Sequence, residues 1–185
     1  MTGPRVIGLD LSLTSTGTAV VTAGGPVEVT TVKAPRPDPA GDPLARDLAR
    51  LRHLRAVVGY AARGCDLAVL EGLAFGTRTG KASERAGLWW FVVDQLTDLG
   101  VPVAVMPPAT RAMYATGKGN APKDLVLVTT ARLYPHVPVT GNDAADALVL
   151  AAAGLDHLGH PLRKLPQTHR RALDKVQWPT TPETP

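Results

Sequence analysis

The sequence contains a single cysteine, Cys65, among its 185 residues. One cysteine excludes an internal disulfide and a cysteine-rich zinc site, and a free cysteine before a predicted strand is typical of a small buried side chain. The longest apolar run of the C-terminal half, Leu148–Leu155, is much shorter than the roughly 20 residues that cross a bilayer. The chain also opens without the basic and apolar regions of a secretory signal. These absences favour a cytoplasmic protein without a membrane segment.

The composition is that of an ordinary globular chain, with little excess of charge of either sign. Hydrophobic residues make up 44% and charged residues 19% of the sequence, and the formal net charge is +4. A length of 185 residues suffices for one domain with a sizeable core. The positive charge is concentrated in the last 25 residues, which hold five basic and two acidic residues among prolines and threonines. We therefore expect a folded domain over residues 1–160 and a basic, mobile tail over residues 161–185.

The spacing of apolar residues indicates which segments form strands and helices. The predicted strands lie at residues 6–11, 16–22, 27–32, 67–70 and 101–106. The predicted helices lie at residues 43–63, 82–99, 122–133 and 142–158. Three strands joined by short turns, followed by alternating helices and strands, are typical of a mixed α/β sheet with helices on its faces.

Four acidic residues stand at positions where a catalytic or metal-binding role is the simplest explanation for a carboxylate. Asp10 interrupts an apolar strand, where a buried charge costs several kcal/mol unless a cation pairs with it. Glu71 ends the strand at 67–70, and ligand sites in α/β sheets gather at strand ends. Asp143 and Asp146 are three residues apart, so they share one face of an otherwise apolar helix. Four converging carboxylates leave a surplus of negative charge, which Mg²⁺ or Mn²⁺ would neutralise.

Each of these acids also has a purely structural interpretation. Asp10 then is a buried acid hydrogen-bonded to a nearby turn, and Glu71 is the first polar residue of a loop. Asp143 stands at capping-box spacing from Thr140, and the helix dipole favours any acid in a first turn. The four acids together, in this order, favour the metal-site interpretation.

Four segments carry a resemblance to a known family. Val6-Ile7-Gly8-Leu9-Asp10, the strand that ends in Glu71, and Asn142–Leu148 resemble the RuvC family of Holliday-junction resolvases. The segment Thr116–Lys123 resembles the glycine- and lysine-bearing segment of the same family. The match runs from about Val6 to Leu158 and implies an RNase H-like fold, with a mixed five-stranded sheet of three antiparallel strands followed by parallel strands.

The chain departs from the family pattern in two places. Leu11-Ser12-Leu13 follow the first aspartate, where many members have a Pro-Gly-Ser turn, and Gly72–Phe75 follow Glu71. These departures are consistent with either a diverged or a phage-type member of the family.

The resemblance implies a metal-dependent nuclease that resolves four-way DNA junctions in recombination and repair. Two Mg²⁺ ions, for which Mn²⁺ substitutes, would lie about 3.5–4 Å apart, one activating water and the other stabilising the leaving 3′ oxygen. Asp10 would bridge both ions, Glu71 would hold one, and Asp143 and Asp146 would complete the set. No nucleophilic side chain is needed, so the lack of a Ser-His-Asp arrangement does not argue against this mechanism.

Basic residues and one aromatic residue are the candidates for DNA contact. Lys118 and Lys123 would neutralise charge at the scissile phosphate or grip DNA, the alternative being a solvated loop and a helix's first turn. An exposed Phe75 would wedge between bases at a branch point, and its alternative is a place in the core. The residues expected to line the DNA path, each also consistent with solvated surface, are Arg78, Lys81, Arg85, Arg111 and Arg132.

The segment 87–93 is apolar on every side, which is typical of a helix buried on two sides. One side would face the sheet, and the other would face a second subunit around Leu88–Val93. A two-fold homodimer suits a junction that needs two symmetric cuts. A fully interior helix in a monomer is the alternative.

Several other functions compete with junction resolution. A nuclease of the same fold could act on flaps, forks or RNA–DNA hybrid, and a catalytically silent protein could bind junctions only. An actin-like ATPase is disfavoured, since such proteins clasp nucleotide between two domains and 185 residues are too few. Gly117-Lys118-Gly119 also lacks the spacing of a Walker A loop.

Overall fold

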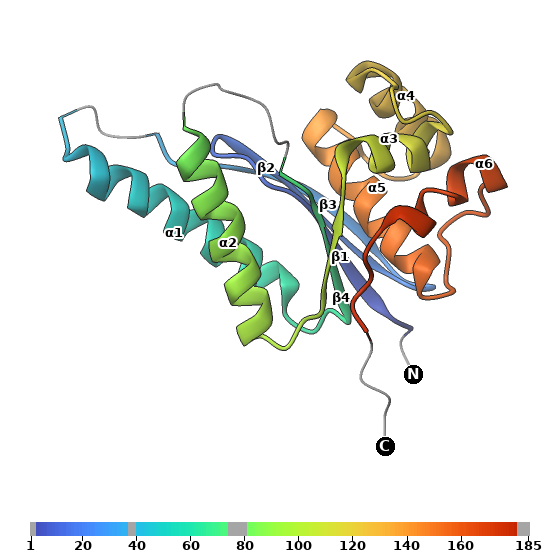
Figure 1. The fold of residues 1–185 in the computed structure, drawn as a ribbon, viewed down its shortest axis with the longest axis horizontal. Coiled ribbons are helices and arrows are strands. Elements are labelled where there is room, and N and C mark those ends of the chain that lie inside the picture. The colour runs from blue at the N-terminus through green and yellow to red at the C-terminus, as the bar shows by residue number, and fades with distance from the viewer. Residues whose placement is uncertain (1–2, 37–39, 74–80, 181–185) are drawn as a thin grey trace.

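The computed structural model describes residues 3–36, 40–73 and 81–180, and its centre is one mixed sheet (Figure 1). The strands are β1 (Arg5–Asp10), β2 (Ser15–Thr22), β3 (Val27–Lys33), β4 (Leu67–Glu71) and β5 (Val103–Met106). Their order across the sheet is β3-β2-β1-β4-β5. The first three strands pair antiparallel, whereas β1–β4 and β4–β5 pair parallel. The prediction of a five-stranded sheet with antiparallel and then parallel strands is therefore confirmed.

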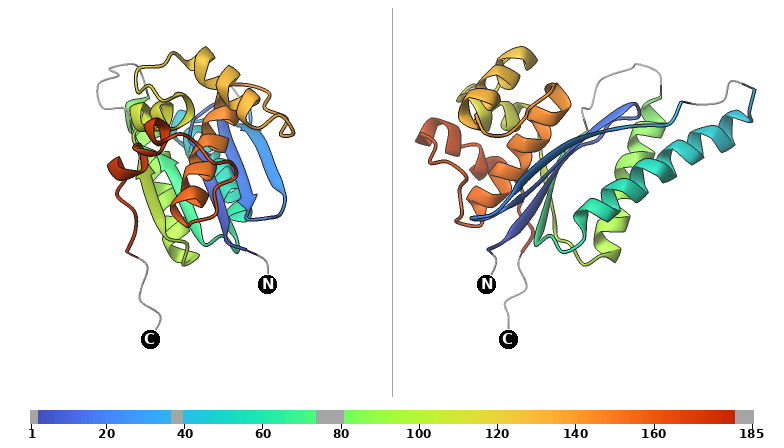
Figure 2. Two further views of the ribbon diagram at one scale, coloured as in Figure 1. Left: turned by 90° about the vertical axis from the view of Figure 1, so that its right-hand side faces the viewer. Right: turned by 180° about the vertical axis from the view of Figure 1, so that it is seen from behind.

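Helices cover both faces of this sheet, as the two views of Figure 2 show. One face carries α1 (Pro43–Ala62) and α2 (Ala82–Asp98). The other carries α3 (Pro108–Thr116), α4 (Lys123–Leu133), α5 (Asn142–His157), α6 (Gln167–Arg170) and the 3-10 turn η1 (Leu173–Lys175). Within the described residues, no helix combines the length and apolar character needed to cross a membrane.

Alternation along the strands supplies a core on each face of the sheet. On β1, Ile7 and Leu9 belong to the cluster beneath α1 and α2, whereas Val6 belongs to the cluster beneath α5. Successive strand residues point to opposite faces, so a sheet covered by helices on both sides needs apolar residues at nearly every position. This requirement explains why β1 and β4 are continuous apolar runs whose polar residues come at the ends.

Local sequence signals set the ends of the helices, and two helices, α3 and α6, were not predicted. At α1 the Asp42 carboxylate accepts a 2.7 Å hydrogen bond from the Ala45 amide, and Pro43 begins the helix as expected. The sequence predicted only a stop at Pro107-Pro108, whereas the structure begins α3 at Pro108. Proline lacks an amide hydrogen that a first-turn residue does not need, so it both ends β5 and starts α3.

Helix α5 is the most buried helix of the structure, and it lies unusually close to the sheet. Every residue from Ala144 to Asp156 is buried, and many are alanines. A Cβ atom at Gly8 would collide with the carbonyl oxygen of Ala147, and one at Gly17 would collide with the carbonyl oxygen of Asp143. Two glycines on the sheet therefore let the backbone of α5 rest almost directly on β1 and β2.

The expectation of a mobile tail from residue 161 differs from the structure, in which residues 161–180 pack against the domain. Leu165, Ala172 and Val176 are buried in the same cluster as α5. The Arg170 guanidinium donates to both carboxylate oxygens of Asp156, at 3.1 and 3.0 Å. Asp156 is 2% exposed, and a buried carboxylate needs such a cationic partner. The basic composition of the segment thus reflects in part an internal ion pair, while residues 181–185 lie outside the described residues.

Candidate active site

Asp10 and Glu71 end neighbouring parallel strands, so their side chains meet at one edge of the sheet. The register pairs Leu9 with Leu70, which places the two acids side by side at the carboxyl ends of β1 and β4. Asp143 and Asp146 stand in the first turns of α5, which packs on β1 and β2. The structure thus brings the four acids of the sequence prediction into one cluster.

Burial and the repulsion between neighbouring carboxylates raise the pKa of two acids in the cluster, Asp10 and Asp146. Burial, followed by the charge of Glu71, raises the pKa of Asp10 to about 8, and Asp146, a hydrogen bond with Glu71 and Asp143 add to the rise. Burial also raises the pKa of Asp146 to about 6, although the charges of Arg111 and Lys123 oppose the rise. A carboxyl that holds its proton near neutral pH lacks sufficient cationic partners. The chemistry of these donors therefore fits a hard divalent cation.

Arg111 already places one positive charge inside this cluster. Its Nε donates to Glu71 Oε1 at 2.7 Å, and its Nη1 donates to Asp146 Oδ1. The expectation that Arg111 lines an open DNA path is wrong, because the residue is only 4% exposed. In the part of the chain that the structure describes, no three Asp, Glu, His or Cys side chains stand as a ready metal cage. The carboxylates are arranged around a guanidinium instead.

Comparison with known proteins identifies the family. No protein-family model matches the chain. A crossover junction endodeoxyribonuclease RuvC of Zymomonas mobilis is 32% identical over 155 residues, which cover 82% of this chain and 90% of that protein. A protein of the same name from Synechococcus is 30% identical over 160 residues, covering 81% of this chain and 97% of that protein. The chain belongs to the RuvC family.

Solved structures of the RuvC family share the fold. Thermus thermophilus RuvC superposes with a TM-score of 0.65 at 21% identity, over 84% of this chain and 97% of that one. The same protein in complex with a Holliday junction substrate gives a TM-score of 0.64 at 19% identity, over 85% and 97% of the two chains. Together with the strand order, these matches establish the RNase H-like architecture that the sequence resemblance implied.

The predicted lysines of this RuvC-family chain differ in their distance from the acids. Lys123 is the first residue of α4, and its charge acts on Asp146, so it lies near the cluster. Lys118 is exposed in the turn after α3, where its amide and carbonyl both bond to the Thr116 hydroxyl. Lys81 precedes α2 and pairs with Asp47 at 3.3 Å.

The remaining predicted DNA-binding residues fall in three places. Arg85 lies in the first turn of α2, and Arg132 is exposed near the end of α4. Phe75 and Arg78 lie outside the described residues. The structure therefore supports a location beside the acids for Lys123.

Two contacts that hold the site in place were not evident in the sequence. The Trp89 indole donates to the carbonyl oxygen of Glu71 at 3.1 Å and ties the end of β4 to α2. The Thr16 hydroxyl donates to the Ser12 carbonyl oxygen at 2.9 Å and accepts from the Ser12 amide at 3.2 Å. The second pair closes the loop after Asp10 in place of the family's Pro-Gly-Ser turn.

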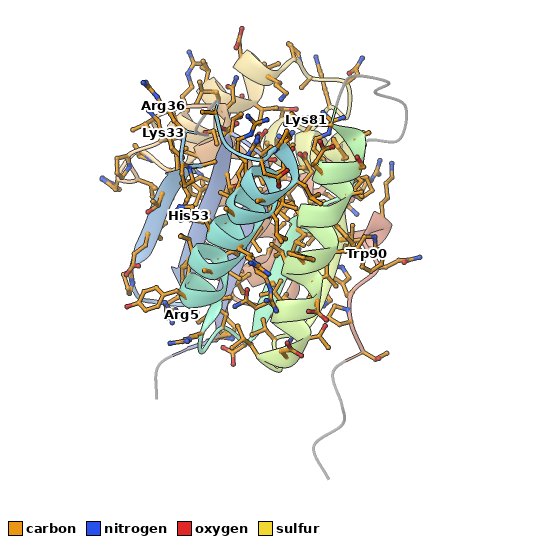
Figure 3. The ribbon with its side chains drawn as sticks, turned by 90° about the vertical axis from the view of Figure 1, so that its left-hand side faces the viewer. Arg5, Lys33, Arg36, His53, Lys81 and Trp90 are labelled. Carbon is orange, nitrogen blue, oxygen red and sulfur yellow. The ribbon has the colours of Figure 1, made fainter. Side chains whose placement is uncertain are left out.

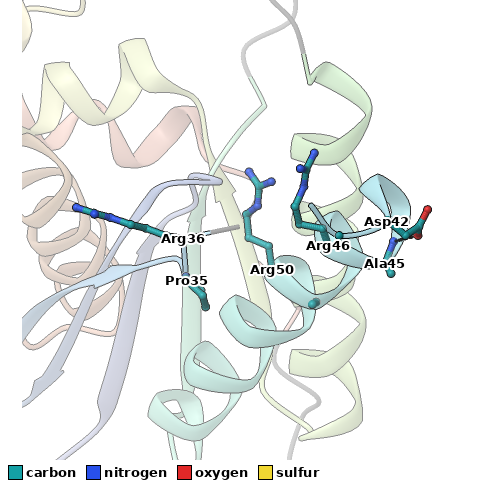
Figure 4. A pocket seen from close by; sticks show the side chains of 8 residues that line it. Pro35, Arg36, Asp42, Ala45, Arg46 and Arg50 are labelled. Carbon is teal, nitrogen blue, oxygen red and sulfur yellow. Dashed lines mark hydrogen bonds between the residues drawn. The ribbon is translucent and has the colours of Figure 1, made fainter. Parts of the chain in front are cut away.

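A basic hollow lies where α1 begins, toward the same end of the molecule as Lys81 (Figure 3). Its volume is about 310 Å³, and it is lined by Pro35, Arg36, Gly41, Asp42, Ala45, Arg46, Ala49 and Arg50. Figure 4 shows the Arg46 and Arg50 side chains pointing the same way, with Arg36 directed apart from them. The buried Nε of Arg46 has no hydrogen-bond partner among the described residues, so this hollow presents an unsatisfied donor. Sequence reasoning did not single out these arginines, because basic residues on an amphipathic helix usually face solvent.

Proposed function

We propose that this chain is a structure-specific endodeoxyribonuclease that resolves four-way DNA junctions by metal-dependent hydrolysis of phosphodiester bonds. The observation that carries the proposal is the buried cluster of Asp10, Glu71, Asp143 and Asp146 at one edge of an RNase H-like sheet. The curated relatives are named crossover junction endodeoxyribonucleases, and one structural neighbour is described in complex with a Holliday junction substrate. The proposed DNA substrate agrees with the cytoplasmic location expected from the sequence.

The four acids would hold the catalytic metal, Mg²⁺ with Mn²⁺ as a substitute. A divalent ion at such a site activates water and stabilises the charge of the transition state and the leaving oxygen. Asp10 contributes a carboxyl that gives up its proton when a cation arrives, since its pKa lies near 8 without one. The number of ions is a separate question, because Arg111 already stands among the acids.

The chain's own residues would position the substrate and neutralise its charge. Lys123, whose charge reaches Asp146, is placed to contact the scissile phosphate. Trp89 fixes the carbonyl of Glu71 and thereby the start of the loop that follows β4. Arg36 and Arg46 line the hollow at the start of α1, where Arg50 pairs with Asp47. This hollow would contact the phosphates of the DNA backbone.

A homodimer through α2 would supply the two-fold symmetry of the reaction. Trp90 is 61% exposed and Phe91 36% exposed, whereas Leu88 and Val92 on the same helix are buried in the core. In Figure 3 Trp90 lies on the side of α2 that faces away from α1. A large exposed aromatic beside apolar neighbours is typical of an interface between subunits.

The decisive experiment compares labelled four-way, flap, fork, RNA–DNA hybrid and linear substrates, with Mg²⁺ or with chelator. We expect paired symmetric nicks in the four-way junction only. They should be lost in chelator and reduced at least about 1,000-fold in Asp146→Asn, because that change removes a carboxylate that would hold the metal, and the metal would stabilise the transition-state charge. Asp98→Asn, an exposed acid at the end of α2, is the matched control and should cut normally.

Other outcomes would redirect or overturn the proposal. Cuts mainly in flaps, forks or hybrid would keep the metal-dependent chemistry and reassign the substrate. Tight binding of the junction without cutting in either Mg²⁺ or Mn²⁺ would refute nuclease activity and leave a junction-binding protein.

A further inference from the structure

The guanidinium of Arg111 lies among the carboxylates of the candidate active site. Its side chain is 5% exposed, and it donates to one oxygen of Glu71 and one oxygen of Asp146, the residues that join β4 to α5 across the site. Because the arginine side chain stays protonated at any physiological pH, this charge is permanent. Two of the four acids therefore already share a cation before any metal binds.

Arg111 is not placed to swing out of the cluster. It stands in the middle of α3, flanked by the buried residues Thr110 and Ala112. The same helix is anchored by Tyr114, whose hydroxyl donates to Asp156 at 3.1 Å. Removing the guanidinium would leave the buried Asp146 and the partly buried Glu71 without their cationic partner, which destabilises the fold. Displacement of Arg111 by an incoming ion is thus opposed by the packing of the whole helix.

Arg111 lowers the negative charge that metal ions must neutralise. Four ionised carboxylates carry four negative charges, and the buried guanidinium returns one positive charge. Lys123 is exposed, so solvent screens its charge. One divalent ion would leave a residual charge of −1, whereas two would leave the centre with a charge of +1.

We infer that Arg111 takes the place of one of the two metal ions, so that the centre binds a single divalent ion beside a fixed guanidinium. The ion would be held by Asp10 and Asp143 together with the carboxylate oxygens of Glu71 and Asp146 that Arg111 does not engage. This inference rests on the proposed nuclease function, and it corrects the expectation of two ions.

The test is the number of Mn²⁺ ions bound per chain, measured by calorimetry and by electron paramagnetic resonance of the full-length protein. The measurement is made without DNA and with a nicked duplex, which is a product and is not cut further. We expect one isolated Mn²⁺ per chain in the natural protein and in Arg111→Lys, which keeps the charge. Arg111→Gln should bind two ions and show the magnetic coupling of a close pair. Arg52→Gln, an exposed arginine on α1, is the matched control and should bind one.

Thermal unfolding in chelator and in Mn²⁺ supplies a second readout. Arg111→Gln should melt lower than the natural protein in chelator and recover more in Mn²⁺, because the added ions replace the lost charge. Two coupled ions in the natural protein, or a single ion in Arg111→Gln, would overturn the inference and leave the nuclease function standing. If Arg111→Gln does not fold, the number of Mn²⁺ ions bound by the natural protein and by Arg111→Lys still decides between one ion and two. Binding of no ion at all would overturn both the inference and the metal-dependent function.

Discussion

At the scale of single residues, Asp10 stores a proton that a metal ion would displace. Its pKa of about 8 in the folded chain lies above the ordinary value of 3.8 because of burial and neighbouring carboxylates. The folded state therefore binds this proton more tightly than the unfolded state between about pH 4 and pH 8. Stability of the metal-free protein must fall as pH rises through that window.

Asp10→Asn should remove this penalty. In chelator at pH 8 we expect the variant to be more stable than the natural protein by at least about 1 kcal/mol, or roughly 2–4 °C in melting temperature. Below about pH 4 the difference should nearly vanish, since Asp10 is then protonated in both the folded and the unfolded natural protein. Thermal unfolding at both pH values checks this, and an equal difference at the two would contradict it. Cleavage by the variant should be lost at either pH.

Cys65 provides an independent test of burial at a place far from the acids. The residue is 7% exposed, as the sequence predicted for a small buried side chain, and burial raises the pKa of its thiol to about 11. Only the thiolate reacts with alkylating agents, so at pH 8 we expect native alkylation to be at least about 100-fold slower than in guanidinium chloride. Mass spectrometry of timed samples measures both rates, and comparable rates would refute the buried position.

At the scale of elements, the C-terminal segment depends on one ion pair. Asp156 on α5 is buried, and its partner Arg170 reaches it from α6 with a side chain that is half exposed. Arg170→Gln leaves a buried carboxylate that, among the described residues, keeps the hydrogen bond from the Tyr114 hydroxyl as its side-chain support. We expect a loss of about 2 kcal/mol in the free energy of unfolding, measured in urea. The exposed neighbour Arg171→Gln is the control, and equal effects of the two variants would contradict the role of the pair.

The elements differ in how well their sequence predicts them. The strands and the long helices follow from apolar periodicity, because burial against a sheet demands it. Helix α3 was missed because Pro107-Pro108 signals the end of a strand as strongly as the start of a helix. The packing of residues 161–180 was missed because it depends on Asp156, a residue that looks like an ordinary polar helix end until its burial is known.

In the candidate site, too, some residues could be predicted from the sequence and one contact could not. The four acids could be predicted since each violates a local rule, such as a charge in an apolar strand or a pair on the apolar face of α5. Arg111 violates none, because an arginine in a short helix is unremarkable by itself. Its partners Glu71 and Asp146 lie 40 and 35 residues away in the chain, and only the folded structure brings them together.

At the scale of the whole molecule, the exposed aromatic side of α2 predicts the oligomeric state. Trp90→Glu places a charge in the proposed interface, so we expect a monomer in light scattering after size exclusion, with unchanged circular dichroism. Such a monomer should nick junctions singly rather than in symmetric pairs. Val128→Glu, on the opposite layer and 44% exposed, is the control and should stay dimeric. A natural protein that is monomeric at micromolar concentration would contradict the proposed dimer.

The two glycines beneath α5 bear on how mutational maps of this protein are read. Gly17 pairs with Asp10 across the sheet and also lies against the backbone of Asp143. It therefore sets the distance between the acid on β1 and the acids on α5. Any side chain there would push the two halves of the centre apart. A saturation library scored by activity would therefore rank Gly17 among the least tolerant positions. Such a map would mark a residue with no functional group as strongly as the acids it separates.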